Sequence, residues 1–331
     1  MNQKIRFNDG WEFAKSDLSV QNCGNLRFQP VDLPHDWLIE NTENLYEDSI
    51  GWYRRKYAYH ADGNRILLAM DGVYMDCALY VNRAAAGEWK YGYSSFEWDL
   101  TDALREGENE ILVKVVFRSP NSRWYTGAGI YRNVWLKTQG PSHFAANGIY
   151  VSTAQEKSGW RVDVDAELDA ASDVRIAHRI LYRGRTVAET EASVHGPGKS
   201  LCSAQTLHVK KPHLWSPDQP SLYRLVSVLY TGSRTEKPVE TVTQNIGFRH
   251  IEFLPDAGLR LNGRFLKLHG VCNHHDLGAL GSALNVCALK RRLALLKAMG
   301  VNALRTSHNM PSPELMDLAD QMGFLVDCEG F

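Results

Sequence analysis

The chain reads VNALRTSHNMPSPELMDLADQMGFLV over residues 301–326, and this stretch carries the clearest signal of its fold class. A short segment at 301–306, with Val301, Ala303 and Leu304 as its apolar residues, precedes a segment at 313–322 that begins with proline, and an apolar run follows at 324–326. Proline in the first turn and glycine just after the last turn are the usual boundaries of an α-helix. The stretch therefore predicts a strand, a helix and a further strand.

A second unit of the same kind lies immediately upstream. The apolar run FLKLHG at 265–270 predicts a strand. A helix is predicted between an Asn285 cap and Gly300, because apolar residues recur at steps of three and four: Val286, Leu289, Leu293 and Leu296. Strands that alternate with helices over such short connections are parallel to one another. Residues 251–331 are therefore predicted to be the start of an α/β sheet or barrel.

The predicted barrel unit is incomplete. Three parallel strands leave hydrophobic faces and an unpaired edge, which folded proteins avoid. We therefore expect that the chain is part of a longer protein, or that its last unit is partly disordered or covered by a partner.

The rest of the chain has the pattern of antiparallel β-structure. Short alternating segments broken by turn residues fill 1–140, and this pattern is typical of a β-sandwich. A second alternating region at 141–250 has the strand spacing of a small immunoglobulin-like sandwich. The predicted fold class is therefore mostly β and multidomain: two sandwiches followed by the first strands and helices of a barrel.

Composition excludes several classes of function. The formal net charge is −1, from 37 basic and 38 acidic residues, so neither nucleic acid nor an anionic membrane is an expected partner. No apolar run is long enough for a membrane helix, and residues 1–20 lack the core of a signal peptide. We expect a cytoplasmic protein, unless an export signal has been removed.

Cysteine and aromatic usage carry weaker information. The six cysteines form no C-x-x-C pair and no zinc-ligand spacing, so we expect free and mostly buried thiols. The 9 tryptophans and 14 tyrosines suit stacking on sugar rings, although packing in a sheet core is the usual role of any single one. No nucleophile elbow, phosphate loop or dinucleotide fingerprint occurs.

Candidate functional residues follow the three predicted parallel strands, because such residues collect at the carboxyl ends of strands. They are Asn273, His274, His275 and Asp276 after the first strand; Arg305, Ser307, His308 and Asn309 after the second; and Asp327 and Glu329 after the third. Adjacent histidines at a strand end point in opposite directions, so we expect hydrogen-bonding roles for them, with a metal site as the alternative.

The charges at these strand ends allow more than one interpretation. Arg305 is expected to be a buried cation that needs an anion, supplied either by a carboxylate elsewhere in a complete barrel or by Glu329 or Asp327. Glu329 is a tempting catalytic acid, but glycoside hydrolysis needs two carboxyl groups and no second one is evident. We therefore interpret Glu329 as a structural partner.

Several motifs, in order along the chain, resemble glycoside hydrolase family 2, the group of β-galactosidases, β-glucuronidases and β-mannosidases. They are LPHDW at 33–37, GWYRR at 51–55, RWYTGAGIYR at 123–132, GFR at 247–249, LNG at 261–263 and NALRTSH at 302–308. The family fold implies a jelly-roll-like sugar-binding sandwich over 1–140, an immunoglobulin-like sandwich over 141–250 and a (β/α)8 barrel truncated within 251–331.

The resemblance also implies roles for individual residues. His308 would bind sugar hydroxyls, and Arg305 would orient the nucleophilic glutamate. Arg123, Trp124 and Tyr125 would lie in a sandwich loop over the barrel mouth. The remaining candidates for substrate binding or for orienting the nucleophile are Asn309, His275, Asp276 and Glu329.

The catalytic pair itself is expected to lie outside this chain. In the family the acid/base glutamate follows the fourth barrel strand and the nucleophile follows the seventh, so no catalytic residue and no metal ligand is predicted here. Two departures concern specificity: Asn309-Met310 stands where relatives often have tyrosine and proline, and Cys328 stands where aspartate is usual.

The expected function is that of a retaining exo-β-galactosidase acting on terminal β-galactosides, of which this chain is an inactive amino-terminal part. A β-glucuronidase or β-mannosidase of the same family, or a non-catalytic carbohydrate-binding protein, is the alternative. No cofactor is predicted for the chain, and a Mg²⁺ or Na⁺ ion in the complete enzyme is left open. The expected partner is a small β-galactoside, and a homo-oligomer is left open.

Overall fold

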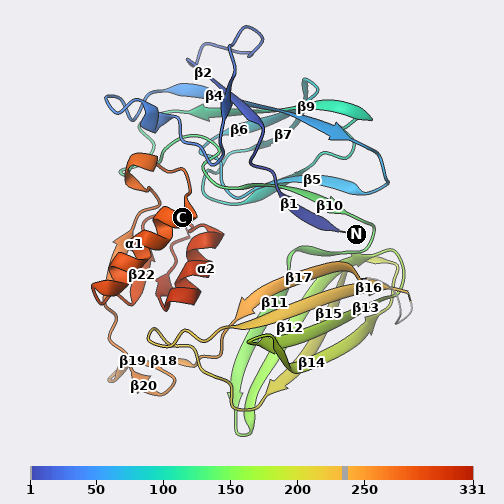
Figure 1. Ribbon diagram of the computed structural model, residues 1–331, viewed down its shortest axis with the longest axis vertical. Coiled ribbons are helices and arrows are strands. Elements are labelled where there is room, and N and C mark those ends of the chain that lie inside the picture. Colours follow the sequence, from blue (N-terminus) through green and yellow to red (C-terminus); the bar gives the residue numbers. More distant parts are fainter. Residues whose placement is uncertain (1, 233–237, 331) are drawn as a thin grey trace.

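The computed structural model describes residues 2–232 and 238–330. Figure 1 shows three parts: an upper β-sandwich, a lower β-sandwich and a small α/β unit that lies beside both. The predicted fold class is confirmed, because strands dominate and the two helices belong to a partial barrel.

The upper sandwich consists of two antiparallel sheets. Their strand orders are β3-β2-β4-β9-β6-β7 and β1-β10-β5-β8. The strands are β1 Gln3–Arg6, β2 Trp11–Ser16, β3 Gln29–Val31, β4 Ser49–Tyr59, β5 Arg65–Met70, β6 Cys77–Val81, β7 Ala84–Trp89, β8 Phe96–Asp99, β9 Gly107–Phe117 and β10 Val134–Gln139. Alternate side chains of both sheets, such as Tyr53, Leu68 and Val113, fill the core between them.

The lower sandwich packs a three-stranded sheet, β11-β12-β15, against a four-stranded sheet, β14-β13-β16-β17. The strands are β11 His143–Glu156, β12 Gly159–Ala170, β13 Val174–Tyr182, β14 Arg185–Val194, β15 Gly198–Val209, β16 Tyr223–Thr231 and β17 Pro238–Ile246. Seven antiparallel strands in two sheets are the architecture of an immunoglobulin-like domain.

A parallel sheet, β21-β22-β23, forms the centre of the α/β unit. Its elements are β21 Gly270–Asn273, α1 Val286–Ala298, β22 Ala303–Thr306, α2 Pro313–Met322 and β23 Leu325–Asp327. Both helices begin at side-chain caps, since Asn285 and Ser312 accept hydrogen bonds from backbone amides three residues later. A small antiparallel sheet of β18 Ile251–Leu254, β19 Gly258–Leu261 and β20 Arg264–Phe265 precedes them.

The strand predicted over 265–270 is wrong. Phe265 ends β20, Gly270 begins β21, and the residues between them belong to no strand. The apolar residues that suggested a strand are exposed, Phe265 to 68% and Leu268 to 48%. The hairpin of β19 and β20 extends to Leu266, whose amide donates to the Leu259 carbonyl, and this pairing shifts the barrel strand toward the carboxyl terminus.

The expectation of mostly buried thiols is also wrong. All six cysteines are free, but only Cys77 is buried; Cys23 is half-buried and the other four are exposed. Cys202 and Cys287 face outward from a strand and a helix, and Cys272 lies on the face of the parallel sheet that no helix covers. The exposure of each thiol depends on which side of its strand or helix the cysteine lies. The amino-acid composition contains no information on this.

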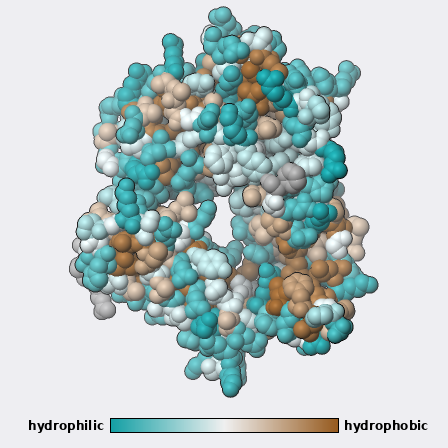
Figure 2. All heavy atoms as spheres, turned by 180° about the vertical axis from the view of Figure 1, so that it is seen from behind, coloured by the Kyte–Doolittle hydropathy of each residue, from teal (hydrophilic) through white to brown (hydrophobic). Residues whose placement is uncertain are grey.

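Apolar surface gathers on the α/β unit, on the right in Figure 2. Its exposed side chains include Val286, Leu295, Met299 and Met310. Val286, Leu295 and Met299 belong to α1 or its C-cap and Met310 to the loop before α2, so these side chains lie on the helical layer and not on the open face of the parallel sheet. Within the described residues, no helix has the length and apolar character needed to cross a membrane.

One buried histidine makes the lower sandwich sensitive to acid. His178 is fully buried in the core, where its Nδ1 lies 2.8 Å from the Ser227 hydroxyl oxygen. Burial lowers the pKa of His178 from 6.5 to about 4. The unfolded chain binds this proton more tightly than the folded chain, so stability is complete above the unfolded pKa and falls as the pH drops toward the folded one.

We expect the free energy of unfolding to fall by about 3 kcal/mol from His178 alone between about pH 7 and about pH 4. Chemical denaturation followed by circular dichroism at both pH values measures this loss. His178→Gln should flatten the pH dependence, whereas His269→Gln, at an exposed position outside the lower sandwich, should leave it unchanged. An identical pH dependence in the parent and in His178→Gln would rule out this histidine as the cause.

Candidate functional site

A carboxylate links the ends of two parallel strands. The Oε2 of Glu329, just after β23, lies 2.9 Å from His308 Nδ1, just after β22, and its Oε1 forms an ion pair with Arg305 of β22. The Glu329 amide also donates to the Thr306 hydroxyl at 3.0 Å. Since both carboxylate oxygens are engaged, Glu329 is placed to orient its neighbours rather than to donate a proton.

Arg305 lies on the open face of the parallel sheet. In register it is flanked by Cys272 and Asp327, whereas Leu304 packs toward the helices. The predicted burial of Arg305 is wrong, because its side chain is 48% exposed. Its pairing with Glu329 is one of the alternatives considered from the sequence, and contact with the Cys272 thiol and the charge of Glu329 raise the pKa of Arg305.

A loop of the upper sandwich, between β9 and β10, meets these strand ends. The Trp124 ring lies 5.3 Å from the His308 ring, and Trp124 Nε1 donates to the Tyr93 hydroxyl at 3.1 Å. The His274 ring, after β21, meets the His308 ring edge-on at 5.8 Å. Three rings from three separate segments therefore surround one patch beside the ion-paired carboxylate.

The other predicted site residues have different partners or are exposed. Tyr125 donates its hydroxyl proton to Asp36, His275 Nε2 donates to the Thr126 carbonyl at 3.0 Å, and Arg123 is exposed. Burial lowers the pKa of His275. The Asp276 carbonyl accepts from Arg292, and Asn309 is buried with its amide donating to the Met310 carbonyl.

The structure thus brings Arg305, His308, Glu329, Trp124 and His274 together. Both His274 and His275 are strand-end candidates from the sequence, but only His275 is among the residues assigned to substrate binding or to orienting the nucleophile. Alternation at a strand end indicates that only one of two adjacent histidines can face the patch, but it does not say which one.

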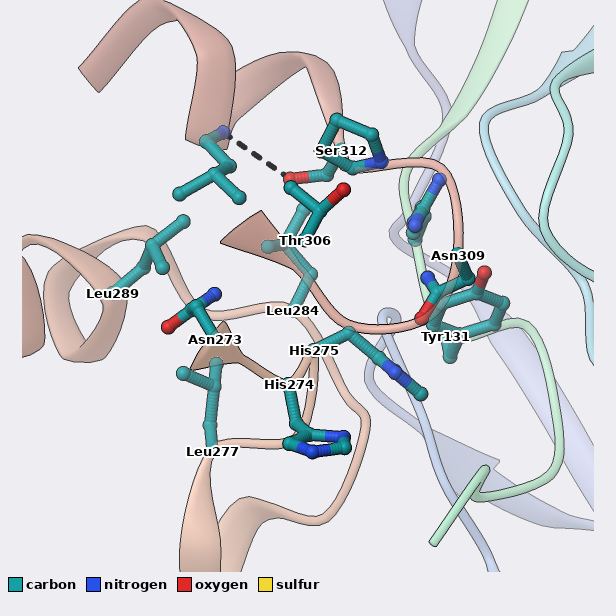
Figure 3. A pocket seen from close by; sticks show the side chains of 13 residues that line it. Tyr131, Asn273, His274, His275, Leu277, Leu284, Leu289, Thr306, Asn309 and Ser312 are labelled. Carbon is teal, nitrogen blue, oxygen red and sulfur yellow. Dashed lines mark hydrogen bonds between the residues drawn. The ribbon is translucent and has the colours of Figure 1, made fainter. Parts of the chain in front are cut away.

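A small cavity lies behind the patch, between the strand ends and the two helices (Figure 3). Its lining includes Asn273, His275, Thr306, Asn309 and Ser312, and the dashed line in the figure marks the cap of α2. Its volume of about 30 Å³ has room for about one or two water molecules and none for a sugar ring. Among the described residues, no group of three His, Cys, Asp or Glu side chains is arranged to hold a metal ion.

A buried carboxylate, Asp36, joins the sandwich to the α/β unit. Asp36 is 2% exposed and accepts hydrogen bonds from the amides of Ala128 at 2.9 Å and Ser282 at 2.8 Å. It also accepts from the Tyr125 hydroxyl at 2.6 Å and the Leu38 amide at 3.1 Å. One side chain therefore ties the loop that carries Trp124 to the segment after β21.

Glycines make this close approach possible. Gly127 and Gly281 both have positive φ, +66° and +58°, and a Cβ on either would collide with the Asp36 carboxylate. Further bonds reinforce the joint: Arg132 Nη2 donates to the Met310 carbonyl at 2.7 Å, and the Leu284 amide donates to the Tyr131 carbonyl at 3.0 Å.

The lower sandwich holds the other end of the α/β unit. Trp215 Nε1 donates to the Asp320 carbonyl at 2.8 Å, and Lys297 Nζ donates to the carbonyls of Pro217 and Gly323. The strand ends are therefore positioned by contacts with both sandwiches.

Three models of one protein family match consecutive parts of the chain. The sugar binding domain of glycosyl hydrolases family 2 matches residues 16–141, the glycosyl hydrolases family 2 model matches 144–249, and the family's TIM barrel domain matches 254–330.

Curated relatives match over nearly the whole chain. A protein of Bacteroides ovatus described as Beta-galactosidase BoGH2A is 40% identical over 99% of this chain and 41% of its own length. A protein of Bacteroides fragilis described as Beta-glucuronidase is 30% identical over 99% of this chain and 49% of its own length. The chain thus spans less than half of these relatives.

Solved structures agree. A glycosyl hydrolase family 2 member from Bacteroides cellulosilyticus superposes with a TM-score of 0.92 at 36% identity, covering 99% of this chain and 48% of that one. A beta-glycosidase from Bacteroides vulgatus superposes with a TM-score of 0.88 at 33% identity, covering 99% of this chain and 44% of that one.

We expect Asp36→Ala to lower the free energy of unfolding by about 3 to 5 kcal/mol, because it leaves several buried hydrogen-bond donors without an acceptor. Chemical denaturation followed by tryptophan fluorescence measures the change. Asp32→Ala, at an exposed position in the same segment, is the matched control and should shift stability by less than about 0.5 kcal/mol. Equal effects of the two substitutions would contradict the role given to Asp36.

Proposed function

We infer that this chain, which belongs to glycosyl hydrolase family 2, supplies the sugar-binding sandwich, the immunoglobulin-like domain and the first barrel strands of a retaining exo-β-glycosidase. The observation that carries the proposal is the meeting of Trp124 with His308 and His274 at the strand ends. An indole face beside imidazole nitrogens suits a sugar, which presents C–H groups for stacking and hydroxyls for hydrogen bonding.

Each residue of the patch takes a part in the proposed reaction. Trp124 stacks on the sugar, and His308, held by Glu329, hydrogen-bonds its hydroxyls. Arg305 extends over the open sheet face, where a later barrel strand would bring the nucleophilic carboxylate. In a retaining mechanism one glutamate attacks the anomeric carbon while a second protonates the leaving oxygen, and water then releases the sugar.

A terminal β-galactoside is the substrate we favour. The motif RWYTGAGIYR at 123–132 resembles galactosidase-like members, and the Bacteroides ovatus relative, at 40% identity, carries the name Beta-galactosidase. A β-glucuronide is the competing substrate, because the Bacteroides fragilis relative is described as Beta-glucuronidase. The two differ by a carboxylate at the sugar's C6, so parallel assays with both nitrophenyl glycosides distinguish them.

We expect residues 1–331 alone to show no turnover of nitrophenyl β-galactoside. The proposed acid/base and nucleophile come from the fourth and seventh barrel strands, and this chain contains the first three. Release of nitrophenol by the purified chain, compared with a buffer blank, measures this. Robust hydrolysis would show that the catalytic pair lies within these residues.

In a longer protein that contains the whole barrel, His308→Ala should lower kcat/KM by roughly a hundredfold or more, equivalent to about 3 kcal/mol of transition-state stabilisation. His195→Ala is the matched control, because this histidine is exposed on the lower sandwich. Steady-state kinetics on nitrophenyl β-galactoside gives both values. Unchanged kinetics in His308→Ala would remove this residue from the site.

A further inference from the structure

The outer face of the six-stranded sheet carries a polar cleft that is separate from the strand-end patch. Trp52 and Arg54 of β4, Leu112 of β9 and Tyr80 of β6 lie on this face, because the alternate residues of these strands fill the sandwich core. In Figure 1 this sheet forms the upper layer, turned away from the lower sandwich.

The segment between β2 and β3 crosses this face and closes only part of it. Its apolar side chains, among them Leu18, Val20, Cys23 and Leu26, pack against Ile50, Trp52 and Leu112. Beside this contact a cleft of about 490 Å³ remains. Its lining combines that segment with β4, β6, β9 and the turn between β6 and β7, and includes Trp52, Arg54, Tyr80, Arg83, Glu110 and Leu112. Its size falls in the range of roughly 300–1,000 Å³ that is usual for small-molecule sites.

The cleft has polar groups with no partner within the protein. Among residues 2–232 and 238–330, the exposed Arg83 side chain and the half-buried Glu110 carboxylate make no hydrogen bond or ion pair, and the half-buried Tyr80 hydroxyl makes no hydrogen bond. A donor, an acceptor and a group that can act as either therefore converge on one space. Such a combination matches the vicinal hydroxyls of a sugar.

The charge of the cleft favours a neutral ligand. Arg54 is neutralised by Glu12, whose Oε2 accepts from its Nε at 2.9 Å and its Nη2 at 2.8 Å. Arg83 and Glu110 then leave one charge of each sign. An anionic ligand would meet Glu110 and a cationic one would meet Arg83, whereas an uncharged saccharide can hydrogen-bond to both.

We propose that this cleft is a second saccharide site, which binds one or two rings of an uncharged glycan with Arg83, Glu110 and Tyr80 as its hydrogen-bonding groups. The proposal extends the function proposed above, since a hydrolase that holds its glycan at a second point gains local substrate concentration. It does not depend on the strand-end patch, because the cleft shares no residue with it.

The alkylation rates of individual cysteines can show where on the chain a saccharide binds. Cys23 lines the cleft and is half-buried, and burial raises the pKa of its thiol. Cys202 and Cys287 are exposed on other parts of the chain and serve as internal controls. A saccharide in the cleft should slow alkylation of Cys23 by iodoacetamide severalfold and leave the two control thiols unaffected, as measured by peptide mass spectrometry.

Binding by the whole chain tests the proposal directly, with lactose and cellobiose as probes in isothermal titration. We expect a dissociation constant of about 1 mM, weakened at least about tenfold in the double variant Arg83→Ala/Glu110→Ala and unchanged in His195→Ala, at an exposed position on the lower sandwich. The double variant should keep the parent's melting temperature to within a few degrees, because among the described residues neither side chain makes a hydrogen bond or ion pair that is lost.

The outcomes separate the two sites. If Trp124→Ala loses binding and the double variant keeps it, the second site is overturned and the strand-end patch is the place of binding. Absence of Cys23 protection and of any heat of binding up to about 10 mM of either sugar would also overturn it. Protection of Cys23 by an added peptide but not by either sugar would assign the cleft to a protein partner instead.

Discussion

The position of the candidate site depends on the buried Asp36 carboxylate. It accepts hydrogen bonds from the sandwich loop, through Ala128 and Tyr125, and from the α/β unit, through Ser282. A charge in such an environment is stable only while its hydrogen bonds are complete. Movement of the α/β unit away from the sandwich would break several of these bonds together, so the two parts are held in one relative position.

This joint also determines which side chains of the loop face the strand ends. Tyr125 points to Asp36, and its neighbour Trp124 points to His308. The second contact is itself supported, because Trp124 Nε1 donates to Tyr93 in the sandwich. The aromatic wall of the proposed sugar site is therefore part of the interface between two domains, which is a common place for ligand sites.

Electrostatics sets apart the two polar regions of the chain. At the strand ends, Glu329 engages both Arg305 and His308, so the charges there are already paired. On the outer face of the sandwich, Arg83 and Glu110 line a cleft without engaging each other. The first arrangement holds side chains in position, and the second leaves hydrogen-bonding capacity available to a ligand.

Local signals in the sequence were enough to locate several helices and strands. Proline, glycine and the capping residues Asn285 and Ser312 define α1 and α2, and period-two alternation located strands such as β12 and β13. The three-part architecture followed from the change of pattern near residue 250, and the motif at 302–308 identified the family.

Tertiary structure alone decided the rest. Pairing of Leu266 with Leu259 placed the first barrel strand at 270–273 instead of 265–270. Docking on the sandwich turned His275 to Thr126 and left His274 beside His308. The pairing of β21 with β22 placed Arg305 on the open face of the parallel sheet. These outcomes depend on which distant segments provide hydrogen-bond partners and which ones cover a given face. Such long-range contacts produce no periodic pattern in the sequence.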